Sequence, residues 1–131
     1  MRILLAEDSG FMRVALERLL VKAGHQVATV SDGQQAIQIA TGNVPELILL
    51  DMMLPKFSGL EVLERLKQNP ATQHIPVIVL TSLSQKNEGK LLQAGAAAYL
   101  TKSDKLLEGD SSLLALVNTV GPKAKATSSS T

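Results

Sequence analysis

Short runs of aliphatic residues recur along the chain and divide it into alternating segments. The runs are four or five residues long, with one polar interruption at Thr29. Continuous apolar runs of this length are typical of strands buried on both faces, as in a parallel sheet. We therefore predict strands at residues 3–6, 27–30, 47–50, 77–80 and 96–100.

Between these runs the apolar residues follow helical spacing. Met12, Leu16, Leu19 and Ala23 lie on one side of the first such segment, and Gly24 follows as a C-terminal stop. Capping residues and Gly or Pro signals mark the other starts and stops. We expect further helices opening at 31–33 and running to about 41, and at 60–68, 84–94 and 111–120.

Five alternations of strand and helix predict one α/β domain with a parallel sheet and right-handed crossovers. We assign residues 1–120 to this domain. Residues 121–131 contain mainly Lys, Ala, Thr and Ser without apolar periodicity, and we predict a disordered tail there. In parallel sheets of this kind, ligands bind beyond the carboxyl ends of the strands. We therefore look for functional residues at those strand ends.

Composition excludes several classes of function. The 131 residues suffice for about one domain, and 45% of them are hydrophobic. Thirteen Lys and Arg against twelve Asp and Glu leave a net charge of +1, so no broad basic field for nucleic acid is present. The lack of cysteine excludes disulfides and thiolate metal sites, and no apolar run approaches the roughly 20 residues of a membrane helix. We expect a soluble cytoplasmic protein that binds neither nucleic acid nor membrane.

Polar side chains follow four of the five predicted strands. Glu7 and Asp8 follow the first strand, Asp51 the third, Thr81 the fourth and Lys102 the fifth. Three carboxylates brought to one rim would repel each other unless a cation joined them. Oxygen ligands without His or Cys select Mg²⁺ or a similar ion. The pattern predicts a metal-assisted phosphoryl-transfer centre in which Lys102 neutralises phosphate oxygens.

The order of these motifs resembles the receiver domain of bacterial two-component response regulators, which have the chemotaxis-regulator fold. The resemblance covers nearly all of residues 1–120. It is carried by Glu7-Asp8, by Asp51 followed by Pro55 and Gly59, by Thr81 after a Val/Ile strand, and by Tyr99-Leu100-Thr101-Lys102. It implies a doubly wound (βα)5 three-layer sandwich with the flavodoxin-like strand order 2-1-3-4-5.

The resemblance also implies which residues accept the phosphoryl group and hold the metal. Asp51 would take the phosphoryl group from a sensor histidine kinase or a histidine phosphotransfer protein and form an acyl phosphate. Glu7, Asp8, Asp51 and the backbone carbonyl of Met53 would hold Mg²⁺, with Mn²⁺ as an alternative ion. The module would assist its own phosphorylation and dephosphorylation without being an enzyme that turns over a separate substrate.

The remaining motif residues are implied to read the phosphorylation state. Lys102 would pair with phosphoryl oxygens, and the Thr81 hydroxyl would move to hydrogen-bond one of them. Tyr99 would then change rotamer on the face formed by the fourth helix, the fifth strand and the last helix. A downstream protein partner or output domain would recognise that face. Ser82 is a rival hydroxyl, although strand alternation points it away from Thr81.

Two other functions use the same residues. A Mg²⁺-dependent phosphatase with an aspartyl-phosphate intermediate would usually carry an acid/base carboxylate two residues after the nucleophile, where Met53 stands here. A degenerate receiver could serve as a constitutive adaptor, but the complete set of acids, nucleophile, hydroxyl and lysine argues against it.

Two positions depart from the family pattern. Ser103 stands where a proline usually follows the lysine, so we predict a trans Lys102–Ser103 peptide, and the direction of the Lys102 side chain no longer follows from the family pattern. Met53 and Leu83, each two residues beyond a motif residue, are apolar. Because neither side chain can position an attacking water, we hypothesise slow self-dephosphorylation.

Overall fold

The computed structural model describes residues 1–82, 88–102 and 112–121 of the chain. Its centre is a five-stranded parallel sheet with strand order β2-β1-β3-β4-β5, which confirms the predicted fold class and topology. The strands are β1 (Arg2–Ala6), β2 (Gln26–Val30), β3 (Leu47–Asp51), β4 (Val77–Thr81) and β5 (Ala98–Thr101).

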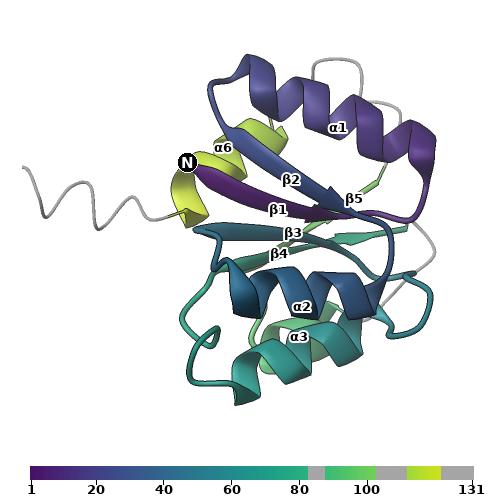
Figure 1. Ribbon diagram of the computed structural model, residues 1–131, viewed down its shortest axis with the longest axis vertical. Coiled ribbons are helices and arrows are strands. Elements are labelled where there is room, and N and C mark those ends of the chain that lie inside the picture. Colours follow the sequence, from purple (N-terminus) through teal and green to yellow (C-terminus); the bar gives the residue numbers. More distant parts are fainter. Residues whose placement is uncertain (83–87, 103–111, 122–131) are drawn as a thin grey trace, which may run out of the picture.

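Helices cover both faces of the sheet, with α1 and α6 on one side and α2 and α3 on the other (Figure 1). Their bounds are α1 (Gly10–Lys22), α2 (Gly33–Gly42), α3 (Gly59–Gln68), α4 (Glu88–Gln93) and α6 (Ser112–Val120). Ser9, Asp32 and Ser58 cap α1, α2 and α3 by accepting a hydrogen bond from a backbone N–H of the first turn. Helices α1 and α2 begin shortly after the strand that precedes them, whereas the loop of residues 52–58 separates α3 from β3.

The core has two halves, one on each side of the sheet. In β3 all five residues are buried, and alternate residues enter opposite halves. Ile48 and Leu50 pack with residues of α2, α3 and α4, whereas Leu47 and Leu49 pack with residues of α1 and α6. Burial on both faces explains why this strand has no polar alternation in the sequence.

The fifth strand begins later than its apolar run predicts. Gly95 has a φ of 110°, and the N–H of Ala96 donates to the carbonyl of Leu91 at the end of α4. Ala96 is therefore buried as part of the helix termination, and the strand starts at Ala98. The start of the helix predicted at 84–94 and residues 122–131 of the tail predicted at 121–131 lie outside the described residues.

In the described part of the chain, no helix is both long and apolar enough to cross a bilayer.

Candidate functional site

Two buried carboxylates and one ammonium meet at the carboxyl ends of the central strands. Glu7 directly follows β1 and is fully buried, and Asp51 ends β3 with 3% of its surface exposed. The Nζ atom of Lys102 lies 3.1 Å from Oε1 and 3.3 Å from Oε2 of Glu7, and 3.4 Å from Oδ1 of Asp51. The strand ends thus bring together residues that are up to 95 positions apart in the chain.

Lys102 reaches this cluster from the end of β5. Its backbone N–H donates to the carbonyl of Thr81 at 2.6 Å, which extends the β4–β5 ladder, where Thr81 pairs with Thr101. Its side chain is only 21% exposed. The lysine therefore points into the rim although Ser103 follows it, while the Lys102–Ser103 peptide adjoins residues outside those described.

The surroundings of Glu7 favour its neutral form. Burial raises the pKa of Glu7, and a hydrogen bond with Asp51 and the negative charge of that neighbour raise it further. The N–H of Ser9, which donates to Oε2 of Glu7 at 3.0 Å, and the charge of Lys102 act in the opposite direction. One ammonium thus incompletely compensates two buried carboxylates, so additional positive charge would be favourable here.

This charge imbalance and the oxygen donors fit a hard divalent cation. Asp8, the third acid of the predicted set, is exposed on the loop between β1 and α1. Among the described residues, no group of three or more His, Cys, Asp or Glu side chains converges on one point. Mg²⁺ does not require such a group, because it usually keeps several waters and takes one or two carboxylates.

Met53 lies beside the acid–lysine cluster and contacts Asp51 through its backbone rather than its side chain. Its N–H donates to Oδ1 of Asp51 at 3.2 Å, and its side chain is 67% exposed. This hydrogen bond holds the loop after β3 against the carboxylate of Asp51. The thioether of Met53 carries no acid or base group, so this side chain cannot transfer a proton.

The two candidate hydroxyls differ in burial. Thr81 ends β4 and is 3% exposed, and its hydroxyl makes no hydrogen bond within the described ranges. Ser82 is half-buried. The register pairs Asp51 with Leu80, so alternation places Thr81 on the opposite face of the sheet from Asp51 and does not itself favour Thr81 over Ser82. Tyr99 lies on β5 opposite Val79, with 38% of its surface exposed, and is not part of the acid–lysine cluster.

The loop that carries Asp51 and Met53 is shaped by close backbone contacts. A Cβ on Gly59 would lie 2.5 Å from the carbonyl oxygen of Asp51, so only glycine lets α3 start this close to the acid. Lys56 adopts a φ of 71°, and its Nζ lies 3.6 Å from Oδ2 of Asp32 at the start of α2. The N–H of Gly33 donates to the carbonyl of Pro55 at 3.1 Å, which joins the two loops.

Arg13 is a neighbour of the site that the sequence interpretation missed. Its Nη1 donates to the backbone carbonyls of Glu7 at 3.0 Å and Asp8 at 3.3 Å. In the sequence Arg13 is one of several basic residues on the polar side of α1. A hydrogen bond back to main-chain carbonyls has no sequence signature, so only the folded loop reveals it.

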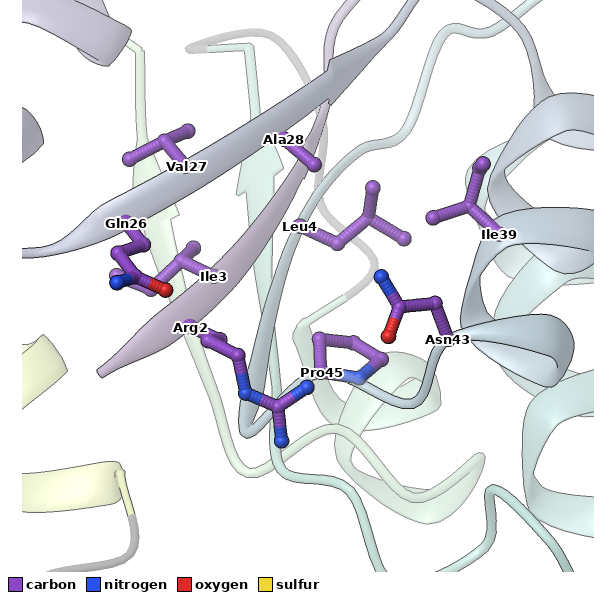
Figure 2. Close-up of a pocket in the computed structure, with 9 residues that line it drawn as sticks. All are labelled: Arg2, Ile3, Leu4, Gln26, Val27, Ala28, Ile39, Asn43 and Pro45. Carbon is purple, nitrogen blue, oxygen red and sulfur yellow. The ribbon is translucent and has the colours of Figure 1, made fainter.

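A pocket lies at the end of the sheet opposite the acid–lysine cluster. It has a volume of about 190 Å³ and is lined by the first residues of β1 and β2 and by the end of α2 (Figure 2). Its charged residue, Arg2, already donates to the carbonyl of Val44 and lies 4.0 Å from Glu46. The acid–lysine cluster at the carboxyl ends is therefore the stronger candidate for chemistry.

Sequence comparison places this geometry among known proteins. The family described as response regulator receiver domain matches residues 3–109. Over 106 residues the chain is 44% identical to a gliding motility regulatory protein of Myxococcus xanthus, which covers 79% of this chain but only 14% of that protein. It is 34% identical over 101 residues to the polar-differentiation response regulator DivK of Brucella anthropi, covering 76% of this chain and 82% of DivK. The chain thus spans about one seventh of the first relative and most of the second.

A solved structure shares the fold. The receiver domain of sensor histidine kinase PA1611 from Pseudomonas aeruginosa PAO1 superimposes with a TM-score of 0.79 at 29% identity, covering 91% of this chain and 95% of that domain. That structure is described as having a magnesium ion coordinated in its active site cleft.

Proposed function

This chain belongs to the response regulator receiver family, and on that premise we propose that it is a phosphorylation-switched module whose phosphoacceptor is Asp51. One observation carries the proposal: the buried carboxylate of Asp51 lies 3.4 Å from the ammonium of Lys102, beside the buried acid Glu7. A carboxylate held next to a fixed positive charge can attack an anionic phosphoryl group without the full repulsion between two anions.

The reaction transfers a phosphoryl group between two proteins. One oxygen of Asp51 forms a bond to phosphorus while the bond from phosphorus to the donor's imidazole nitrogen breaks, and that nitrogen keeps the electron pair. Lys102 pairs with an oxygen of the transferred group, and the hydroxyl of Thr81, buried at the end of β4, moves toward the group to donate to another oxygen. The product is an acyl phosphate on Asp51.

We assign Mg²⁺, or Mn²⁺, to the acidic residues of this site. Glu7, Asp8, Asp51 and the backbone carbonyl of Met53 would hold it, with waters completing its shell. When bound, the ion neutralises charge on the phosphoryl oxygens. The support on this chain is the pair of buried carboxylates, which share a single ammonium; burial, and after it the neighbouring Asp51, raise the pKa of Glu7.

The signal would leave the site through β5. Tyr99 is partly exposed on this strand, between α4 and α6, and follows Thr81 by changing rotamer when the hydroxyl moves toward the phosphoryl group. The face formed by α4, β5 and α6 then presents a different surface to a downstream partner or output domain. Shifting such an equilibrium from 1:99 to 99:1 needs about 5.5 kcal/mol, which one new multiply charged group can provide.

The donor is a sensor histidine kinase or a histidine phosphotransfer protein. Phe11 in the first turn of α1 and Met53 in the loop after β3 are 69% and 67% exposed near the carboxyl ends of the strands. Exposed apolar side chains beside a pocket support docking of a protein rather than of a small phosphate alone. A cytoplasmic location belongs to the same proposal.

A phosphatase reaction with separate substrates is the less favoured alternative. The position two residues after Asp51 holds Met53, whose thioether cannot donate or accept the proton that rapid turnover needs. Sustained hydrolysis of a generic phosphate ester would support the phosphatase instead.

Phosphorylation of Asp51 can be tested directly. The protein is incubated with Mg²⁺ and a small phosphodonor such as acetyl phosphate, and intact mass is measured. Wild type should gain one base-labile phosphoryl group and Asp51→Asn none. Asp32→Asn is the matched control, because Asn caps a helix about as well as Asp and leaves the acceptor in place. Equal labelling of wild type and Asp51→Asn would exclude Asp51 as acceptor.

A further inference from the structure

Arg13 holds the backbone of the two consecutive acids, Glu7 and Asp8, at the carboxyl end of β1. From the second turn of α1, its Nη1 donates to the carbonyl oxygens of Glu7 and Asp8. We propose that Arg13 is a positioning residue that directs the carboxylate of Asp8 toward a divalent cation. This inference rests on the metal site of the proposed function and adds a residue that the motif set does not contain.

Asp8 needs such support because its own side chain lacks any. Its carboxylate is exposed and makes no hydrogen bond or ion pair with residues 1–82, 88–102 or 112–121. Glu7, in contrast, is held by Lys102 and by the N–H of Ser9, and its own N–H donates to the carbonyl of Val30 at 3.1 Å. The direction of the Asp8 side chain therefore depends on the backbone, and Arg13 is the side chain bonded to that backbone.

The way in which Arg13 bonds also leaves Asp8 available. An arginine five residues after an aspartate could pair with its carboxylate and so compete with a metal for it. Here Nη1 is engaged by two main-chain carbonyls instead, and no ion pair joins Arg13 to an acid among the described residues. The guanidinium thus fixes the loop while the carboxylate stays free.

Arg13 could affect Mg²⁺ binding through its positive charge or by positioning Asp8. The two effects predict opposite changes in Mg²⁺ affinity when Arg13 is replaced. A nearby positive charge repels Mg²⁺, so if charge were its only contribution, Arg13→Met would bind Mg²⁺ more tightly. If Arg13 positions Asp8, the same substitution loosens the loop and weakens binding. Loss of residues that orient metal ligands typically weakens affinity by 10–100-fold, and for a solvent-exposed ligand we expect about tenfold.

The experiment measures Mg²⁺ affinity by isothermal titration calorimetry at constant ionic strength. Wild type, Arg13→Met, Asp8→Asn and the double variant form a cycle, and Arg18→Met serves as control because Arg18 is an exposed arginine on the same helix. We expect the Kd to rise about tenfold in Arg13→Met, to stay nearly unchanged in Arg18→Met, and not to rise further when Arg13→Met is added to Asp8→Asn. Arg13→Gln replaces Arg13→Met in the cycle if the latter does not fold.

An unchanged or lower Kd in Arg13→Met would overturn the positioning role, as would an equal rise in the Asp8→Asn background. These outcomes differ from failure of the proposed function. In that case wild type itself would not bind Mg²⁺, or Asp51 would not be phosphorylated. Normal wild-type behaviour with an unaffected Arg13→Met would refute only the role of Arg13.

Discussion

Replacing Lys102 by methionine removes the cation that two buried carboxylates share. The side chains of Glu7 and Asp51 are 1% and 4% exposed, and the ammonium lies 3.1 Å and 3.4 Å from them. At an effective dielectric constant of about 20, each of these pairs corresponds to about 5 kcal/mol of Coulomb energy. Removing one partner of a buried ion pair costs about 3–5 kcal/mol after relaxation. We expect Lys102→Met to lose about 3 kcal/mol of unfolding free energy near pH 8 without metal.

The loss should depend on pH in a definite direction. The pKa of Glu7 is already raised above its ordinary value of 4.5, and Lys102 is one of the groups that hold it down. Without the lysine, the pKa of Glu7 rises further. A group whose pKa is higher in the folded state than in the unfolded state loses stabilisation as pH rises through the folded value. The deficit of Lys102→Met should therefore be smaller at an assay pH of about 5 than near pH 8, because the raised pKa of Glu7 favours its protonated form as pH falls.

Thermal and urea unfolding in EDTA at the two pH values measure this effect. A loss of about 3 kcal/mol corresponds to roughly 10 °C in Tm for a domain of this size. Lys22→Met is the control, because Lys22 is an exposed lysine in the last turn of α1. An equal loss at both pH values would refute the electrostatic reasoning and attribute the effect to packing of the lysine stem. A loss as large in Lys22→Met would refute it as well.

Two further predictions concern the loop that follows β3. Gly59→Ala would place a Cβ 2.5 Å from the Asp51 carbonyl oxygen and 2.6 Å from the Met52 Cα, so we expect a loss of about 2 kcal/mol in urea unfolding. Gly42→Ala, with nothing within 4 Å, should not destabilise, and equal effects would contradict the steric argument. The acyl phosphate should hydrolyse over minutes to hours, because the Met53 side chain cannot orient a water; Leu83, its predicted partner in this effect, lies outside the described residues. Phosphate release with a half-life of seconds in wild type would reject this prediction.

The positions of the site residues at the strand ends could be predicted because two general rules apply together. Continuous aliphatic runs predict buried parallel strands, and parallel strands deliver their carboxyl ends to one rim. Asp51 and Lys102 were placed at this rim from the sequence, and both lie in the cluster. The fold was equally predictable, since burial on both faces leaves a clear pattern in β3 and β4.

The sequence by itself determined which residue types arrive at the rim, because strand ends and helix caps are set by local patterns. The tertiary structure decided which of these residues contact each other. Lys102 donates a hydrogen bond to Glu7, whereas Asp8 remains exposed. Arg13 donates hydrogen bonds to the backbone carbonyls of both acids. These contacts depend on side-chain rotamers and loop conformations, which are set by packing between residues far apart in the sequence. The local sequence pattern contains no information about such contacts. The charge interactions of the acid–lysine cluster can therefore be derived only from the folded chain.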